Sequence, residues 1–380
     1  MVTVYVSQNG ENVTGERYVG SDSAPIIYAL EYLYSIGGGE LFIENGSYYL
    51  NSAINISQSN IKVRGEGLHT KLIPYSEAST TTLFTVNGTS ENILSNIIIE
   101  DISFGFRNGA TIGGHGLTIS YTDQLTIRGC VFRDNRVTGI TILNSTNVTV
   151  ENSIMDYNGT EGLNLKNLSS CIFANNIIKN NLSQGIYSIE NENILLDNNH
   201  INNNGKYGVV LHTFNNSQVT NNIIKNNISG GIYFSTSSLK SMASKNIVHN
   251  TPFGIIINSS NHINVDGNTC VSISNNGIQP ISSNYSNITG NIISNASYGI
   301  SLNSSSSGTI VGNQVNDVTQ RTIHFMSGST KNNISGNSST GTGSYSISMN
   351  SGANSNYAVG NILSQSVVNG GTSNVLNNKS

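Results

Sequence analysis

Short runs in which apolar and polar residues alternate recur along most of this chain, and a glycine stands before each run. These glycines are spaced by 23 residues from residue 116 to residue 277, and one more follows after 22 residues. They are Gly116, Gly139, Gly162, Gly185, Gly208, Gly231, Gly254, Gly277 and Gly299. Most are followed by an apolar–x–apolar pair, for example Leu117 and Ile119. A fixed period in the twenties built from short alternating runs predicts a solenoid in which each repeat is one supersecondary unit.

Within one repeat, counted from its glycine as position 1, the alternation indicates three short strands. Inward side chains are expected at positions 2 and 4, at positions 10 and 12, and near position 17. Position 17 collects an apolar row made of Phe132, Met155, Ile178, Ile201, Ile224, Ile247, Cys270 and Ile293. Runs this short between Asn and Gly residues favour strands over helices. Three parallel strands per coil of about 23 residues predict an all-β fold, a right-handed parallel β-helix.

Position 14 of the repeat holds residues suited to a tight bend, namely Asn152, Asn175, Asn198, Asn221, Gly267 and Gly290. Asn and Gly tolerate a left-handed backbone conformation. Stacked Asn amides also form hydrogen bonds from one coil to the next. We therefore expect a bend at this position and Asn ladders along the solenoid.

The ends of the chain differ from its regular middle, and we expect a single β-helix domain over residues 1–380. Residues 1–39 are expected to form a strand and a capping helix, since Ile26, Leu30 and Leu33 recur at helical spacing from Ser23 to Tyr34. Residues 40–115 are predicted to form irregular first coils, 116–327 regular 23-residue coils, and 328–380 Ser/Asn/Gly-rich final coils. A helical lid covers the open core and unpaired strand edges that a solenoid end exposes.

Composition narrows the classes of function. Charged residues make up 10 % of the chain and the net charge is −4, so no basic patch suggests nucleic acid as a partner. No apolar run is long enough to span a membrane. The opening MVTVYVSQNG lacks the basic head and long apolar core of a signal peptide. The three cysteines fall at or near inward positions of the repeat and are interpreted as small core residues: Cys130, Cys171 and Cys270.

Two parts of the sequence resemble known β-helix families. The capping helix followed by GGGELFIENGSYYLNSAINI and SNIKVRGEGLHTKLIP resembles the pectate-lyase-like family. The stretches GIYFSTSSLKSM and GIIINSSNHINVDGN resemble the β-helix repeat shared by carbohydrate-binding proteins and sugar hydrolases. The layout is similar to the catalytic module of mannuronan C5-epimerases. These resemblances imply a polysaccharide partner and an extracellular, cell-surface or virion location; they leave the oligomeric state open.

The catalytic motifs of these families are incomplete in this chain. After the Gly-led strand at Gly139, where the epimerases carry an Asp-Pro-His-acid motif, Leu143-Asn144-Ser145-Thr146 follows. Gly114-His115-Gly116 matches the Gly-His-Gly element of polygalacturonases, but no Asn-Thr-Asp or Asp-Asp pair precedes it.

Charged residues gather between Glu100 and Arg136, including Arg107 and Asp123, and this cluster is the first candidate site. Arginines bind carboxylates bidentately, and a histidine or carboxylate moves a proton. The candidate catalytic residues are His115, Asp134 and Arg136, with Arg133 as a candidate for substrate binding. The alternative is structural, because residues one coil apart become neighbours. Two sets of this kind are expected to form salt-bridge ladders: Arg128 with Glu151, and Arg133 with Asp156 and Lys179.

A second candidate site is the outward row on the Gly-led strand and the turn before it. Aromatic faces suit the C–H surfaces of sugars, and polar tips suit hydroxyl groups. The candidate substrate-binding residues in this row are Glu161, Lys166, Tyr187, Tyr207, His212 and Tyr233. The alternative is that the tyrosines only cover one another from coil to coil. A glycosidase pair of Glu161 with Asp156, the nearest acid in sequence, is the weakest hypothesis.

Two classes of function therefore remain open. The first is a polysaccharide-binding protein with lyase or epimerase chemistry on an acidic polymer. The second is a non-catalytic structural or adhesive rod of a cell surface or virion. No residue spacing indicates a metal or other cofactor, and Ca²⁺ stays open as a further ligand.

Overall fold

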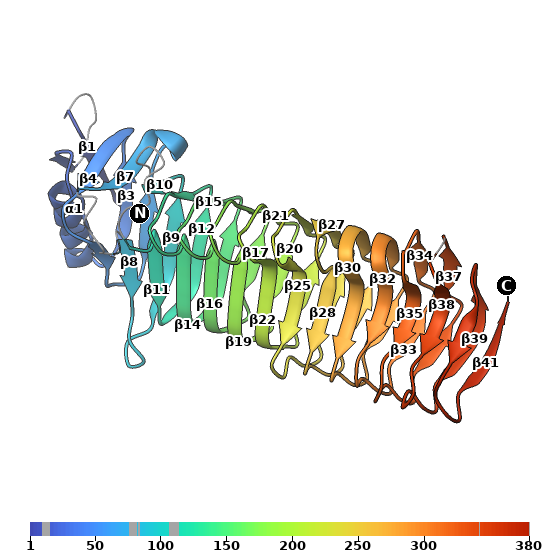
Figure 1. Ribbon diagram of the computed structural model, residues 1–380. Helices are drawn as coiled ribbons and strands as arrows, with labels where there is room; N and C mark the ends of the chain where they lie inside the picture. The colour runs from blue at the N-terminus through green and yellow to red at the C-terminus, as the bar shows by residue number, and fades with distance from the viewer. Residues whose placement is uncertain (10–15, 76–81, 83, 106–113, 342, 380) are drawn as a thin grey trace. The chain divides into compact units, whose positions relative to one another are not determined.

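The computed structural model describes residues 1–380 except 10–15, 76–81, 83, 106–113, 342 and 380. The protein is an all-parallel β-solenoid of about 14 turns with one short helix at its N-terminus, which confirms the predicted fold class. The chain divides into two compact units, Met1–Tyr187 (unit 1) and Ser188–Ser380 (unit 2). Figure 1 shows strands stacked in parallel layers within each unit.

Unit 1 contains the helix α1 (Ala24–Ser35), the short 3₁₀ helix η1 (Gly67–His69) and eighteen complete strands. The strands are β1 (Thr3–Ser7), β2 (Arg17–Val19), β3 (Gly39–Ile43), β4 (Gly46–Leu50), β5 (Ile54–Ile56), β6 (Ile61–Arg64), β7 (Thr70–Pro74), β8 (Phe84–Asn87), β9 (Leu94–Glu100), β10 (Ser103–Gly105), β11 (Leu117–Ser120), β12 (Thr122–Arg128), β13 (Val131–Arg133), β14 (Ile140–Glu151), β15 (Ile154–Asp156), β16 (Leu163–Ser169), β17 (Ile172–Ala174) and β18 (Ile177–Lys179). The chain passes from unit 1 to unit 2 within β19 (Ile186–Glu192).

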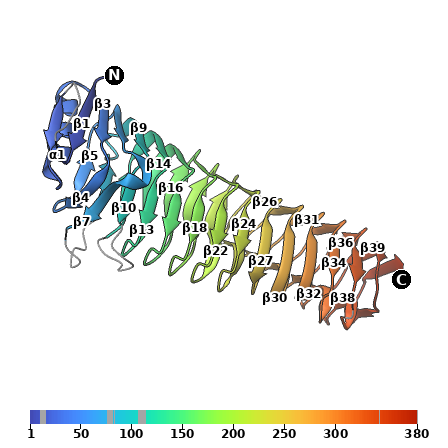
Figure 2. The same ribbon diagram turned by 90° about the horizontal axis from the view of Figure 1, so that it is seen from above.

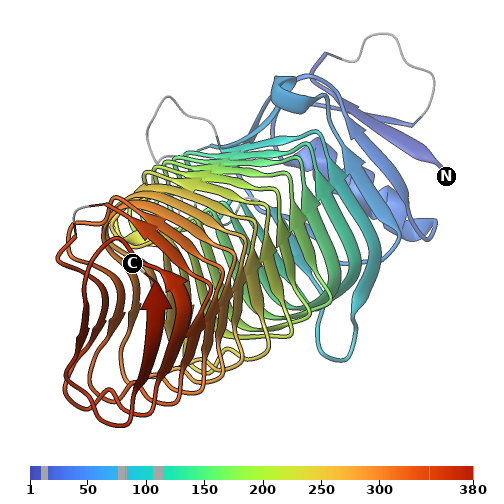
Figure 3. The same cartoon turned by 90° about the vertical axis from the view of Figure 1, so that its right-hand side faces the viewer.

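Unit 2 consists of short strands and turns. Its strands are β20 (Leu195–Asp197), β21 (His200–Asn202), β22 (Tyr207–Asn215), β23 (Gln218–Thr220), β24 (Ile223–Lys225), β25 (Gly230–Ser235), β26 (Met242–Ser244), β27 (Ile247–Thr251), β28 (Ile255–Asn258), β29 (Asn264–Asp266), β30 (Thr269–Ile281), β31 (Asn287–Thr289), β32 (Ile292–Leu302), β33 (Thr309–Val311), β34 (Gln314–Asn316), β35 (Arg321–Phe325), β36 (Asn333–Ser335), β37 (Ser338–Thr340), β38 (Tyr345–Met349), β39 (Tyr357–Ile362), β40 (Val367–Asn369) and β41 (Val375–Lys379). Figure 3 shows its successive turns one behind another.

The N-terminal helix forms where its apolar spacing predicts it. The carboxylate of Asp22 accepts a hydrogen bond from the backbone N–H of Ala24 at 3.0 Å, which satisfies one of the free donors of the first turn. Ile26, Leu30 and Leu33 are buried, and the helix packs against β1, β2, β3 and β5 (Figure 2). The predicted helix is therefore confirmed, and it covers the apolar residues of the first strands.

Equivalent residues of successive coils pair directly in the strands. In unit 1, Leu117 of β11 is the register partner of Ile140 in β14, which pairs with Leu163 in β16. All three side chains are fully buried. At position 17, Ile178 in unit 1 and Ile201 and Ile224 in unit 2 are also fully buried, and so are the three cysteines. The predicted inward positions are therefore confirmed, except in the coil that begins at Gly231, where Lys240 and Met242 at positions 10 and 12 are not buried.

The same coil contains Ile247, which the 23-residue period places inward at position 17. Its side chain is 45 % exposed, and Val248 is buried instead. Val248 pairs with Ile224 before it and with Cys270 after it, so the local spacing is 24 and then 22 residues. The extra residue lies in the preceding turn, where Thr236 and Ser237 both have positive φ. A strand reverses its faces when its register moves by one residue, so the prediction for Ile247 was wrong.

The bends predicted at position 14 are present. Asn152 and Asn175 in unit 1 and Asn198 and Asn221 in unit 2 have φ between 51° and 58°, and Gly267 and Gly290 have φ near 60°. The buried ladder of amides is formed by the next residue along the chain. In unit 2 it runs through Asn199, Asn222, Asn246, Asn268, Asn291, Asn313, Asn337 and Asn361.

The repeated glycines are required because strands of successive coils approach closely. A Cβ atom on Gly162 would lie 2.5 Å from Ile178 Cγ2 and 2.9 Å from the carbonyl oxygen of Gly185. Gly231 and Gly277 meet equivalent obstacles in unit 2. These glycines do not have positive φ, unlike those at position 14. Glycine therefore recurs every 23 residues because one corner of each coil has no room for a Cβ atom.

Candidate functional site

In unit 1 the outward row predicted on the Gly-led strand forms a polar surface over β11, β14 and β16. Thr118, Thr141 and Asn164 are register partners, so they lie in one line across the three strands. Their apolar neighbours in sequence point inward, because side chains alternate along a strand. The residues just before the three glycines, His115, Thr138 and Glu161, border this line. We call these six residues the unit 1 face.

His115 and Glu161, which were predicted for different roles, both belong to the unit 1 face. His115 Nδ1 is 3.0 Å from Thr141 Oγ1. Thr138 Oγ1 lies 2.9 Å from Thr160 Oγ1 and donates to Glu161 Oε2 at 3.4 Å. Burial lowers the pKa of His115 below 6.5, and the nearby Glu161 carboxylate partly opposes that shift. An imidazole whose pKa is lowered in this way is able to accept a proton and return it.

Arg133 belongs to the salt-bridge ladder that the sequence predicts as the structural alternative to a catalytic site, and Asp134 lies next to it. Arg133, Asp156 and Lys179 are register partners in β13, β15 and β18. Asp156 Oδ2 is 3.5 Å from Arg133 and 3.8 Å from Lys179, so the predicted ladder is confirmed. Arg133 Nε also lies 3.8 Å from the Asp134 carboxylate.

Asp134 itself is 6 % exposed and has a φ of 57°. Burial raises its pKa, Arg133 lowers it, and Asp156 raises it again. The sequence treats Asp134 as an acid without a partner one coil away; the ion pair that it makes is with its neighbour in sequence, Arg133. In the described part of unit 1, no hydrogen bond or ion pair joins the Asp134 side chain to His115.

Three other predicted site residues of unit 1 belong neither to the unit 1 face nor to the salt-bridge ladder: Arg136, Lys166 and Tyr187. Arg136 is exposed in the loop between β13 and β14, and its backbone carbonyl approaches Gly159. Lys166 is exposed on β16, and Tyr187 is half-buried at the end of unit 1. Arg136 therefore points to solvent, and no contact between described residues joins it to His115. Arg107 lies outside the described residues.

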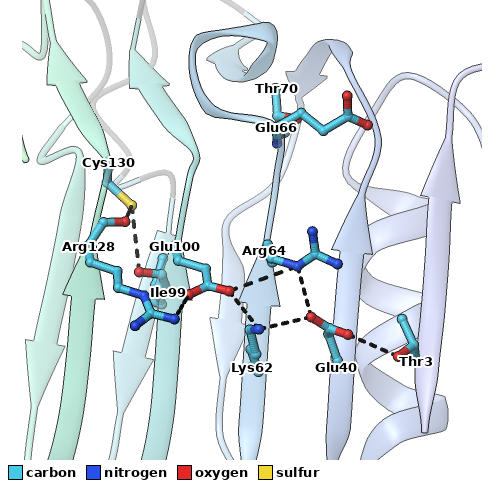
Figure 4. Close-up of polar contacts among 10 residues, drawn as sticks. All are labelled: Thr3, Glu40, Lys62, Arg64, Glu66, Thr70, Ile99, Glu100, Arg128 and Cys130. Atoms are coloured by element: carbon cyan, nitrogen blue, oxygen red, sulfur yellow. Dashed lines mark hydrogen bonds and ion pairs between the residues drawn. The ribbon is translucent and has the colours of Figure 1, made fainter.

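A network of charges connects the outer side of β3, β6, β9 and β12 (Figure 4). The Glu100 carboxylate is 2.6 Å from Lys62 Nζ and accepts a hydrogen bond from Arg128 Nε at 2.6 Å. Glu40 accepts from Arg64 at 2.9 Å and lies 3.1 Å from Lys62. Arg128 and Glu151 are register partners, as predicted, but the ion pair of Arg128 is made with Glu100. This part of the charge cluster therefore stabilises neighbouring turns.

In unit 2, two of the predicted tyrosines form a pair. Tyr207 and Tyr233 are stacked, with ring centroids 5.2 Å apart and an interplanar angle of 25°. Tyr233 Oη accepts a hydrogen bond from Asn258 Nδ2 at 2.8 Å. Gly230 is the register partner of Tyr207, and a Cβ atom there would lie 2.7 Å from the Tyr207 ring. Both tyrosines are half-buried, so they cover one another and still border solvent.

His212 lies on β22, the strand that carries Tyr207. Its Nδ1 is 3.4 Å from Thr236 Oγ1, and burial lowers its pKa. His212, Tyr207 and Tyr233 thus belong to one outer surface of β22 and β25.

Sequence analysis missed a cluster further along unit 2, on β32, β35 and β38. Arg321 Nη1 lies 3.1 Å from His324 Nε2, and the His324 ring stacks on Tyr298 with centroids 5.7 Å apart. Arg321 occupies the place just before the repeat glycine, but Thr322 stands where that glycine is expected. The interruption hid the repeat here, although Ile323 and Phe325 preserve its apolar pair.

Solved structures of similar fold include enzymes and an adhesin. The mannuronan C-5 epimerase AlgE6 A-module of Azotobacter vinelandii is 16 % identical, with a TM-score of 0.64 over 93 % of this chain and 94 % of that one. PfbA, a surface adhesin of Streptococcus pneumoniae, is 14 % identical, with a TM-score of 0.67 over 80 % and 90 %. DFA-IIIase from Arthrobacter chlorophenolicus A6, in complex with GF2, is 14 % identical, with a TM-score of 0.59 over 87 % and 94 %. No curated protein matches the sequence. At these identities the similarity concerns the fold.

Residues 215–373 match the family model described as "Periplasmic copper-binding protein (NosD)". The residues of this chain do not fit a metal site of that kind. Among the described residues, no three His, Cys, Asp or Glu side chains lie together as a metal ion requires. Cys270 is fully buried in the core, and burial raises the pKa of its thiol to about 12. The expectation of Ca²⁺ is not tested and stays a prediction.

The described helices include none that is long and apolar enough to cross a membrane. Residues 31–222, just over half of the chain, match the family model described as "Right handed beta helix region". Together with the parallel coils, the Asn ladders and the similar solved structures, this match identifies the family that the sequence predicts. The chain belongs to the right-handed β-helix family.

Proposed function

We propose that this protein binds a polysaccharide on the outer surface of the glycine-led strands, at an extracellular or cell-surface location. The observation that carries the proposal is the stacked pair Tyr207 and Tyr233, with Asn258 bonded to its hydroxyl. Aromatic rings that combine an apolar body with a polar tip suit sugars, whose C–H faces alternate with hydroxyl groups. The epimerase, the DFA-IIIase and the adhesin of similar fold are consistent with this class of function.

The unit 1 face adds a proposed reaction, the lyase or epimerase chemistry of an acidic polysaccharide. Neutral His115 removes the proton from the carbon beside the sugar carboxylate, and the electron pair of that C–H bond moves into the carboxyl group as an enolate. The pair then expels the sugar oxygen on the adjacent carbon in a lyase, or takes up a proton at the same carbon in an epimerase. Thr141 orients the His115 ring through its contact with Nδ1. Glu161, held by Thr138, balances the imidazolium that forms. Lys166 and Arg136 are exposed cations available to the substrate carboxylate. Asp134 and Arg133 remain candidates, although their mutual contact favours a supporting role.

A non-catalytic rod is the second candidate function. Two observations favour it: the long buried amide ladder of unit 2, which gives stiffness, and the structural similarity to a surface adhesin. In this alternative the stacked tyrosines serve only to cover the turns.

A combined binding and turnover assay separates these functions. The protein is incubated with alginate, pectate and neutral polymers, while absorption of unsaturated sugars in the ultraviolet and proton exchange at C5 are followed. We expect Tyr233→Ala and Tyr207→Ala to weaken polymer binding about tenfold, which corresponds to about 1.4 kcal/mol. The control is Tyr285→Ala, since exposed Tyr285 stacks on His262 in a turn instead.

The reaction is tested with His115→Ala, which is expected to abolish turnover and leave polymer binding by the tyrosine pair intact. Binding without turnover in the wild-type protein would refute the proposed chemistry and retain the binding function. No binding to any polymer would favour the structural rod.

A further inference from the structure

An outward surface of unit 2 carries a cation whose surroundings differ from those of the other cations. Tyr298, Arg321 and Tyr345 are register partners on β32, β35 and β38, so an arginine stands between two tyrosines in the strand register. In the next line across the same strands, Ser301, His324 and Ser348 are register partners. Ile323 and Phe325 fill the core, so His324 lies on the opposite face of the same strand, where it and both serines are almost fully buried. Tyr298, Arg321 and Tyr345 are partly exposed. We call this set the Arg321 cluster.

Arg321 makes no ion pair with an acidic side chain among the described residues of unit 2. It contacts His324, at 3.1 Å from Nη1 to Nε2. A guanidinium has five N–H donors and no acceptor, so this contact uses at most one of them. By contrast, Arg64 and Arg128 of unit 1 face carboxylates directly. The charge of Arg321 is therefore not balanced by an acidic side chain among the described residues of its unit, and most of its N–H donors are available to a ligand.

Buried polar atoms in the cluster also lack partners. His324 is 3 % exposed, and its Nδ1 atom has no hydrogen-bond partner. The hydroxyl of Ser301, its register neighbour, is buried and unpartnered as well. Unpaired polar atoms cost free energy in a protein interior, so they commonly mark a place that another molecule completes. Around the Arg321 cluster, the missing partners are acceptors or small polar groups.

Aromatic residues flank Arg321 in the strand register, Tyr298 on one neighbouring strand and Tyr345 on the other. The Tyr298 ring is stacked on the His324 ring at an interplanar angle of 19°, which holds the imidazole in place. Asn350 Oδ1 lies 3.3 Å from His324 Nε2 at the open side. Tyr298, Arg321 and Tyr345 are all half-buried, so they remain accessible. A planar anion that also carries an apolar ring surface matches this combination.

We propose that the Arg321 cluster is a binding subsite for the carboxylate of an acidic sugar, separate from the Tyr207–Tyr233 pair. Arg321 binds the carboxylate through two parallel N–H···O bonds, and Tyr298 and Tyr345 contact the sugar ring. His324 acts as a positioning residue, because its Nε2 atom holds the guanidinium. The choice of a sugar rests on the proposed function; the anion site rests only on the cluster.

Binding of defined oligosaccharides tests this subsite. The probes are a hexamer of galacturonate, its methyl-esterified neutral form, and a sulfated hexasaccharide, each titrated by calorimetry at 50 and 300 mM NaCl. We expect Arg321→Gln to weaken binding of the acid hexamer at least tenfold and to leave the neutral hexamer unchanged. Arg321→Lys is expected to restore binding only in part, because an ammonium group lacks the bidentate geometry.

The matched control is Lys331→Gln, which removes one exposed positive charge from the same unit. Equal losses in Lys331→Gln and Arg321→Gln would overturn the proposal in favour of general charge attraction, as would an unchanged Arg321→Gln. Preference for the sulfated hexamer would overturn the carboxylate assignment. The outcome is distinct from a failure of the proposed function, since binding of neutral polymers that depends on Tyr233 does not involve Arg321.

Discussion

The two units keep the same backbone plan and join their turns with different polar contacts. In unit 1, ion pairs on the outer surface link neighbouring turns, with Glu100 between Lys62 and Arg128. In unit 2, buried amides link them: Asn268 Oδ1 accepts from the backbone N–H and the side chain of Asn246. Unit 1 has a shorter ladder of this kind, through Asn135, Asn158 and Asn181.

The two kinds of contact differ because amides and charged side chains do not stack equally well from coil to coil. An amide both donates and accepts, so identical residues stack without limit and tolerate burial. Charged side chains must alternate in sign and remain near water, because burial of an ion is costly. An amide ladder is therefore compatible with many identical coils, whereas an ion-pair network suits the irregular first coils, where the sequence of each strand is different.

The largest expected effect comes from filling the tight corner of a coil. Gly254→Ala would place a Cβ atom far inside the contact distance of the Gly277 carbonyl, which is backbone and cannot move away. We expect a loss of about 3 kcal/mol in the free energy of unfolding, measured by urea denaturation and circular dichroism. Gly139→Ala in unit 1 is the comparison, since its nearest carbonyl is 2.8 Å away and Met155 adjusts easily. Equal losses would show that this corner is equally tight in both units.

Breaking the buried ladder is expected to have the next largest effect. Asn268→Ala removes the acceptor of two Asn246 donors and the donor to Asn291 Oδ1. Buried groups left without partners predict a loss of about 2 kcal/mol. The control is Asn287→Ala, whose exposed amide bonds only Asn264; it should change the stability by less than about 0.5 kcal/mol. Similar values for the two variants would contradict a stabilising role for the buried ladder.

Breaking the charge network of unit 1 should lower the free energy of unfolding by less than either of the two changes above. Glu100→Gln leaves Lys62, Arg64 and Arg128 without their shared carboxylate, and the three cations are 22 to 50 % exposed. Because water screens these groups, we expect a loss of about 1 kcal/mol that becomes smaller in 1 M NaCl. Glu151→Gln, which removes a register neighbour of Arg128, serves as the control. A loss that does not depend on salt would indicate packing, not charge.

The smallest expected effect is the dependence of stability on pH through His115. Burial lowers the pKa of His115 in the folded state below 6.5. At a pH between the folded-state pKa and the higher pKa of the unfolded chain, His115 binds a proton in the unfolded chain and not in the folded protein. The stability of the fold therefore falls as the pH drops from 7 through the folded-state pKa. His115→Gln should therefore lose less stability than the wild-type protein between pH 7 and pH 5. An identical pH dependence of the two proteins would contradict the burial of a neutral imidazole.

Much of the fold follows from pattern because the coil repeats. The row of Ile178, Ile201 and Ile224 and the bends at Asn152 and Asn198 lie where the period of 23 places them. The period fails at Ile247, because one residue is inserted in a turn and compensated before Gly254, within the same coil. A one-residue change of this kind leaves the spacing of the glycines intact, so it is invisible from them.

The candidate sites were less accessible to the same reasoning. Stacking predicted the Arg133–Asp156–Lys179 ladder and the contact between Tyr207 and Tyr233. It did not predict that the Glu161 carboxylate influences the pKa of His115, since the two residues are two coils apart and belong to separate motifs. The Arg321 cluster was hidden because Thr322 takes the place of a glycine.

By itself the sequence determined the fold class, the inward rows and the left-handed bends, because each of these depends on local alternation and on residue types repeated at a fixed interval. Only the tertiary structure decided which carboxylate pairs with which cation, that the buried ladder runs one residue beyond the bend, and that Arg321 has no acidic partner among the described residues of its unit. The physical reason is that such contacts depend on side-chain rotamers and on distances of a few ångströms between neighbouring coils. A repeat period fixes which residues are neighbours, and it leaves the direction in which each side chain points undetermined.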